Sequence, residues 1–125
     1  MMLNGALAGL VAITAEPLTP GPITAMVIGS IGAVIMYYGT KLLENFGLDD
    51  VVGAIPVHMF AGIFGTLVVP LTNTDTSFGT QFIGVISVCI FSFVLSWITF
   101  STLKSTVGLR ISRACLLYTS PSPRD

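Results

Sequence analysis

The sequence predicts an all-α fold, a polytopic transmembrane helix bundle with three complete spans and the end of a fourth. Of its 125 residues, 53% are hydrophobic and only 9% are charged, and the mean hydropathy is +0.90. Soluble domains carry about a quarter charged residues. Three stretches without Asp, Glu, Lys or Arg, residues 17–40, 51–74 and 76–103, each exceed the ~20 residues that a spanning helix needs. These observations place the chain in a membrane.

The first two predicted helices are separated by a proline-rich segment. Residues 3–14 form the first, but an apolar helix there covers only about 20 Å of the ~30 Å hydrocarbon core. We therefore expect it to be the end of a spanning helix, in a chain that begins mid-protein. Three prolines and a glycine within residues 16–22 prevent its continuation. The second helix, residues 23–39, ends near Lys41.

A polar loop at residues 72–77 separates the third predicted helix, 51–71, from the fourth, 79–104. Basic residues mark a single side of the membrane, after the second and the fourth helix: Lys41, Lys104, Arg110 and Arg113. Because Lys and Arg are retained on the cytoplasmic side, we expect a multi-pass membrane protein whose C-terminal end is cytoplasmic. The loops that hold Glu16 and Asp75 should then face outward.

Small residues recur at four-residue spacing within three of the predicted helices. They are Gly5 with Gly9, Ala25 with Gly29 and Ala33, and Ala61 with Gly65. That spacing lets helix backbones approach closely where no hydrophobic effect drives association. We therefore expect close helix packing, with further helices beside these.

The chain's only histidine, His58, lies inside the third predicted helix. A titratable ring at membrane depth costs free energy, so it suggests a proton or substrate pathway. If the helix begins near Asp50, the ring lies about 12 Å inward, close to the ~15 Å half-thickness of the core. Gly53, Gly62 and Gly65 would then allow close packing and leave space around a pore. The alternative is a histidine that only packs, through a hydrogen bond to a neighbouring helix.

Asp49 and Asp50 have two interpretations. Acidic residues at a helix N-terminus complement the macrodipole and accept hydrogen bonds from free N–H groups, so we favour a helix cap. A paired-carboxylate site or an acidic cytoplasmic pore exit is the alternative. Inside the helix, Pro56 would leave the carbonyl one turn earlier without its donor.

Several classes of function find no support in the residues. No nucleotide-binding loop, zinc-protease motif or nucleophile elbow is present in the sequence, so we expect no enzyme. One histidine and Cys89 cannot supply the ligands of a metal site, and we expect no metal and no cofactor. A net charge of −1 without a basic stripe argues against nucleic acid as a partner. One alternative stays open: a small membrane anchor subunit of a haem or quinone redox complex, with His58 as ligand.

The last residues differ from the rest of the chain. Cys115 to Asp125 are polar after Tyr118, and these eleven residues read as a translated transposase-type sequencing adaptor. We therefore expect residues 111–125 to be a non-native or disordered tail. Residues 1–110 would be the transmembrane region.

Three segments resemble the C-terminal part of the Amt/Mep/Rh ammonium transporters. They are residues 4–11 with Thr14, residues 49–65 with the element Val-His-x-x-x-Gly-x-x-Gly, and residues 107–110. The likeness covers nearly all of residues 3–110, and the order and spacing of the segments are more specific than any one motif.

The resemblance implies a partial ammonium-transporter fold, about the last four transmembrane helices of a longer subunit that forms homotrimers in the inner cell membrane. It implies ammonium or ammonia as the substrate. It also implies that His58 is the second of two pore histidines, whose partner lies on an earlier helix. A cytoplasmic regulator would act through the region after Arg110. We expect this chain to be inactive alone.

Overall fold

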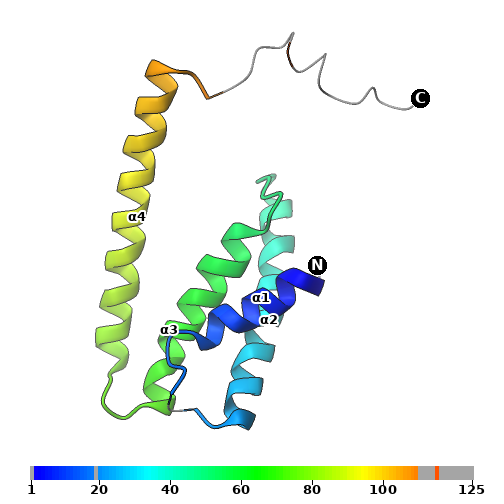
Figure 1. Ribbon diagram of the computed structural model, residues 1–125, viewed down its shortest axis with the longest axis vertical. Coiled ribbons are helices and arrows are strands. Elements are labelled where there is room, and N and C mark those ends of the chain that lie inside the picture. The colour runs from blue at the N-terminus through cyan, green and yellow to red at the C-terminus, as the bar shows by residue number, and fades with distance from the viewer. Residues whose placement is uncertain (1, 19, 110–114, 116–125) are drawn as a thin grey trace, which may run out of the picture. The chain divides into compact units, whose positions relative to one another are not determined.

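The described part of the chain, residues 2–18, 20–109 and 115 of a computed structural model, consists of helices joined by loops (Figure 1). In chain order the helices are α1 (Met2–Ile13), α2 (Pro22–Asn45), the π-helix η1 (Ile55–Phe60), α3 (Ala61–Thr72) and α4 (Phe78–Thr106). The π-helix η1 runs directly into α3. The all-α prediction is confirmed. Arg110 and the predicted tail, apart from Cys115, lie outside the described residues.

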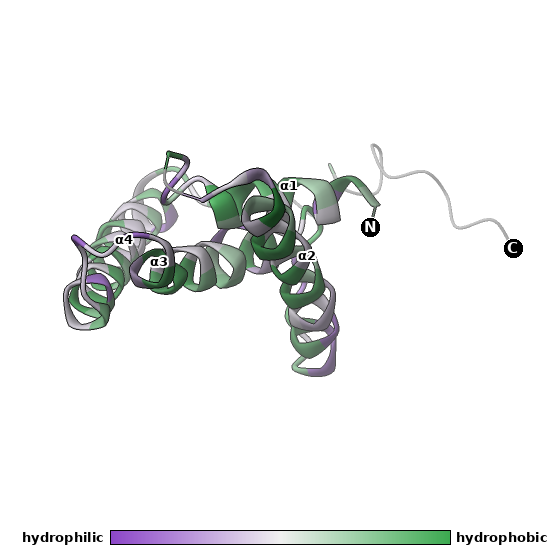
Figure 2. Cartoon of the chain, turned by 90° about the horizontal axis from the view of Figure 1, so that it is seen from below, coloured by the Kyte–Doolittle hydropathy of each residue, from purple (hydrophilic) through white to green (hydrophobic). Residues whose placement is uncertain are grey.

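Three helical stretches are long and apolar enough to cross a membrane: Pro22–Asn45, Ile55–Thr72 and Phe78–Thr106. The helix α1 is apolar but has only 12 residues, which give a length of about 18 Å, short of the ~30 Å hydrocarbon core. The prediction of three spans and one shorter helix is confirmed by length and composition. Hydrophilic residues lie mainly in the loops and at helix ends (Figure 2).

Two predicted helix boundaries are wrong. The second helix continues beyond residue 39 to Asn45, because the polar residues there are compatible with a helix, and it stops before Gly47. Gly47 has a φ of 67°, a left-handed conformation that ends many helices. The third helix begins at Ile55, later than predicted, because Gly53 also has a positive φ of 75° and interrupts the helical path.

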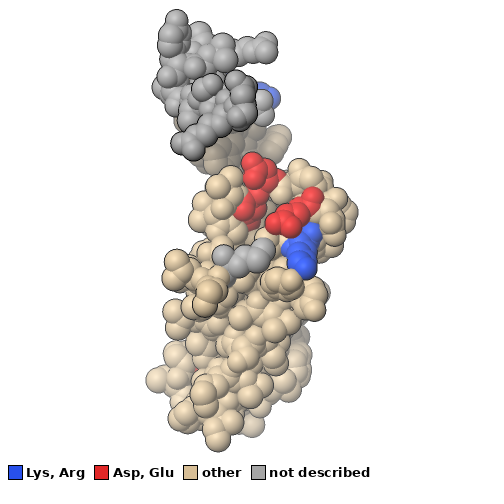
Figure 3. Space-filling view, turned by 90° about the vertical axis from the view of Figure 1, so that its right-hand side faces the viewer, with Lys and Arg blue, Asp and Glu red and all other residues tan. Residues whose placement is uncertain are grey.

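The chain divides into two compact units within α4, after Ile86. In the first unit, α1 packs against α2 and against both η1 and α3. The core of this unit is formed by apolar side chains from these helices: Ala8, Ala12, Ile28, Met36, Leu43, Val57, Ala61 and Val69. Acidic and basic side chains gather at the end of the unit where α2 ends, on the face that Figure 3 shows.

Small residues let α1 approach its neighbours closely. A Cβ atom on Gly9 would lie 3.0 Å from the carbonyl oxygen of Gly29 in α2, and one on Gly32 would lie 2.7 Å from the Cβ of Ala12. A larger side chain at these glycines has no room unless the helices separate. The close packing predicted from the spacing of Gly5 with Gly9 and of Ala25 with Gly29 is found where Gly9 meets Gly29.

The helix α4 is apolar on all sides. None of its residues is buried within the chain, and its apolar side chains are distributed around the helix rather than along one face. A helix of this kind matches a lipid environment or the interior of a membrane protein. Its composition agrees with a chain that is embedded in a bilayer.

Replacing Gly32 by Leu should weaken the contact between α1 and α2, because the new side chain would collide with Ala12 and with the carbonyl oxygen of Ala8. We expect the free energy of unfolding in detergent micelles to fall by about 1–3 kcal/mol, measured as loss of helicity with increasing SDS. Gly84→Leu is the matched control, since a Cβ on Gly84 meets nothing within 4 Å. Equal losses in both variants would contradict the packing described above.

Candidate functional site at the start of the His58 helix

The start of the helix that carries His58 is held by the carboxylate of Asp50. Its Oδ1 accepts a hydrogen bond from the Ala54 N–H at 2.9 Å, and its Oδ2 accepts one from the Ile55 N–H at 2.8 Å. The Asp50 carbonyl oxygen accepts a third from the Gly53 N–H at 3.0 Å. The N–H groups in the first turn of a helix have no acceptor within the helix, and this carboxylate serves two of them.

The same hydrogen bonds keep Asp50 ionised. The Ile55 N–H has the largest effect and lowers the pKa of Asp50 from its ordinary value of 3.8. Desolvation, the next largest effect, raises the pKa, and the Ala54 and Gly53 N–H groups lower it further. An ionised carboxylate at this place also complements the positive end of the helix dipole. Asp49 is exposed and makes neither of these two hydrogen bonds.

A side chain from α1 reaches the same turn. Asn4 Nδ2 donates a hydrogen bond to the carbonyl oxygen of Val52 at 2.9 Å. A Cβ atom on the next residue, Gly53, would lie 2.6 Å from that nitrogen, so Asn4 packs directly on the turn. Asn4 was not predicted from the sequence as a functional residue. The sequence does contain one sign of such a role. Asn4 places a polar amide in an apolar helix, four residues before the small residue Ala8 and hence on the same helix face.

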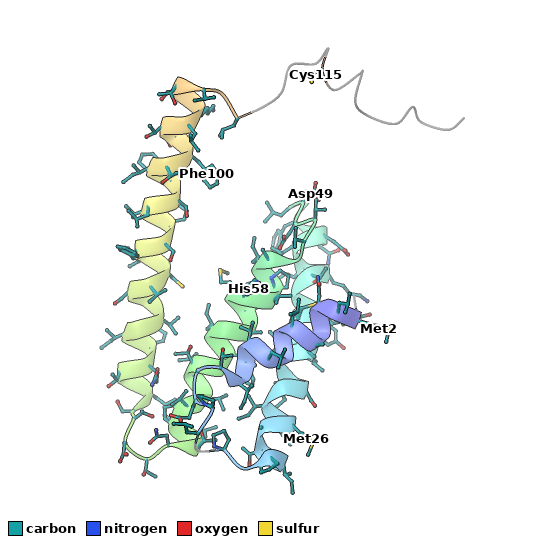
Figure 4. The ribbon with its side chains drawn as sticks, viewed as in Figure 1. Met2, Met26, Asp49, His58, Phe100 and Cys115 are labelled. Atoms are coloured by element: carbon teal, nitrogen blue, oxygen red, sulfur yellow. The ribbon has the colours of Figure 1, made fainter. Side chains whose placement is uncertain are left out.

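His58 lies in the π-helix η1 rather than in a regular α-helix. The N–H of Ala61 reaches back to the carbonyl of Pro56 as well as to that of His58. Single π-helical turns are rare and occur frequently at functional sites. Pro56 and Val57 are buried, whereas His58 is exposed on the described chain (Figure 4).

The helix that carries His58 starts at Ile55 rather than near Asp50, so the predicted depth cannot be counted from a helix that begins at Asp50. The depth of the ring in the membrane stays a prediction. The position of the ring depends on how the turn before η1 is held, and Asp50 and Asn4 hold that turn.

Gly62 and Gly65 contact α1. A Cβ atom on Gly62 would lie 3.7 Å from Val11 Cγ1, and one on Gly65 would lie 2.9 Å from the Cα of Ala12. With Gly53, all three glycines of the predicted site therefore lie against α1. A place for them around a pore stays a prediction.

Side chains suited to metal binding are scattered over the described residues. In that part of the chain, no group of three or more His, Cys, Asp or Glu side chains is placed to hold a metal ion. Cys89 is half-buried and Cys115 is exposed. The arrangement around His58 thus consists of one imidazole beside a capped helix start.

The model of the Ammonium Transporter Family matches residues 1–115 of this sequence. The chain belongs to the ammonium transporter family. A protein of Synechocystis sp. is 39% identical over 121 residues, which cover 89% of this chain and 22% of that protein. Ammonium transporter Amt2 of Archaeoglobus fulgidus is 38% identical over 133 residues, which cover 90% of this chain and 28% of that protein. Ammonium transporter Amt2 of Methanocaldococcus jannaschii is 33% identical over 117 residues, which cover 87% of this chain and 28% of that protein.

The chain spans less than a third of the length of these relatives. The resemblance drawn from the sequence motifs is confirmed at the level of the family, which is one of transporters rather than enzymes. The alternative, a haem or quinone anchor with His58 as ligand, receives no support from the family or from the relatives.

The capping role of Asp50 predicts a pH-dependent helix start. Because the pKa of Asp50 is lowered in the folded chain, its stabilising contribution is complete above the ordinary value of 3.8 and is lost as the pH falls through the folded-state pKa. The amide chemical shifts of Ala54 and Ile55 should therefore titrate with a midpoint below 3.8, and Asp50→Asn should abolish this titration. NMR of the 15N-labelled chain in micelles measures both.

The matched control for this titration is Asp49→Asn, which removes the neighbouring carboxylate. It should titrate like the unaltered chain, since Asp49 does not bond to the Ala54 and Ile55 N–H groups. A midpoint at or above the ordinary pKa of aspartate in the unaltered chain would contradict the capping role.

Proposed function

We propose that this chain supplies pore-lining transmembrane helices to an ammonium or ammonia transporter. The observation that carries the proposal is the family match over residues 1–115, together with helices long and apolar enough to cross a membrane. The relatives from Archaeoglobus fulgidus and Methanocaldococcus jannaschii are named ammonium transporters. Since the chain matches less than a third of their length, we propose that it acts within a longer subunit and is inactive alone.

In this proposal, His58 acts on the pathway of the substrate or its proton. Moving an ammonium ion into an apolar pore costs several kcal/mol, whereas neutral ammonia passes far more easily. Imidazole can donate at one ring nitrogen while it accepts at the other, which suits a proton relay. The exposed ring supports this role, because it is open to a partner and follows a helix start that the Asp50 carboxylate caps. The second histidine would come from an earlier helix of the subunit.

We further propose a homotrimer in the inner cell membrane, with the C-terminal end in the cytoplasm and a regulator that acts beyond Arg110. The basic residues support this orientation: the Lys41 Nζ lies 4.5 Å from the centre of the Tyr37 ring near the end of α2, and Lys104 lies in the last turn of α4. The exposed Asp49, on the same side as Lys41, fits an acidic pore exit. The apolar surface of α4 fits contact with lipid.

We expect the chain alone not to transport, because it matches less than a third of the length of its relatives. Expressed in cells that lack ammonium transporters, it should give uptake of radiolabelled methylammonium equal to that of cells with an empty vector. An immunoblot of the membrane fraction checks that the chain is inserted. Saturable uptake above the empty-vector level would contradict the proposal.

A chimaera makes the role of His58 testable in a full-length subunit. Residues 2–109 replace the matching segment of the Archaeoglobus fulgidus transporter, and His58→Ala is introduced. The substitution should alter the proton-coupled current and lower methylammonium uptake at least about tenfold, because a proton relay is lost. Met59→Ala, at the exposed neighbouring position, is the matched control. Unchanged current and selectivity in His58→Ala would defeat the assigned role.

A further inference from the structure

Val52 presents a backbone carbonyl that the following helix cannot serve. The first carbonyl of the helical ladder is that of Gly53, which accepts from the Val57 N–H at 3.1 Å. One residue earlier, the Val52 carbonyl would need an N–H at position 56, where Pro56 has none. This carbonyl is therefore open to a donor from outside the helix.

Asn4 of α1 is that donor. Its Nδ2 lies 2.9 Å from the Val52 carbonyl oxygen, across 48 residues of sequence. Asn4 lies on the same face of α1 as Ala8 and Ala12, which are 0% and 2% exposed in the core. The face of α1 that packs on the other helices therefore also carries the amide to the turn. Gly53 has no side chain to keep the amide away.

We propose that Asn4 is a positioning residue that, together with Asp50, fixes the start of η1 and thereby the place of His58. Asn4 holds the carbonyl just before Gly53, and Asp50 holds the N–H groups just after it. A glycine is the most flexible residue of such a turn. Because the residues on both sides of Gly53 are restrained, Asn4 and Asp50 together fix the direction in which η1 leaves the turn. The importance of this for transport rests on the proposed function of His58.

Three substitutions separate the hydrogen bond from general packing. Asn4→Asp keeps the shape of the side chain but replaces the donor with an oxygen that faces the Val52 carbonyl. Asn4→Gln keeps the donor on a side chain that is longer by one methylene, and serves as the rescue. Asn45→Asp makes the same chemical change at an exposed position at the end of α2 and is the matched control.

Amide hydrogen exchange and NMR of the His58 ring, in the full 125-residue chain in detergent micelles, test the proposal. Asn4→Asp should speed exchange at Ala54 and Ile55 about three- to tenfold, as expected for the loss of one hydrogen bond. It should also shift the ring nitrogen resonances of His58. Asn4→Gln should restore both toward the unaltered chain, and Asn45→Asp should leave both unchanged.

Two results would overturn the proposal. One is unchanged exchange at Ala54 and Ile55 in Asn4→Asp. The other is exchange that rises as much throughout α3 as at the turn, since Asn4 would then be a general packing residue. Uptake by the chimaera separates these results from the proposed function. If Asn4→Asp loosens the turn but His58→Ala leaves uptake unchanged, the positioning role stands and the proposed function fails.

Discussion

The contact of one face of α1 with two other helices at once is the constraint on which the first unit depends. In lipid, apolar side chains gain little from leaving the solvent, so helices associate by close packing of small residues and by hydrogen bonds. Ala12 lies where the three helices meet: its Cβ is adjacent to Gly32 of α2, and its backbone is adjacent to Gly65 of α3. No larger residue fits at either glycine unless the helices separate.

At the N-terminal end of this face, packing is joined by a hydrogen bond. Because Ala8 and Ala12 are buried against the neighbouring helices, they fix how α1 is rotated and hence where the Asn4 amide lies. The amide holds Val52, and Asp50 completes the turn. The 12 residues of α1 contact both η1, which carries His58, and α3.

Features with a local pattern were predictable from the sequence, and contacts between distant residues were not. Runs without charge predicted the spans, because charges are costly in hydrocarbon. The order and spacing of three segments, including the one around His58, predicted the family. The late start of the His58 helix had no such signal, since a sequence shows a glycine but not the positive φ of Gly53. The bonds from Asn4 to Val52 and from Asn73 to Glu16 join residues that are 48 and 57 positions apart. No periodicity links such pairs.

The distance between Asn4 Nδ2 and the carbonyl carbon of Val52, in a lipid bilayer, tests the account most directly. Solid-state NMR of the chain with 15N in asparagine side chains and 13C in valine carbonyls measures it, and the Asn4→Asp variant assigns the signal. The separation of 2.9 Å between nitrogen and oxygen predicts about 4 Å or less to the carbon, given the length of the carbonyl bond. A distance beyond about 6 Å, too long for a hydrogen bond, would contradict the claim that α1 fixes the turn before His58.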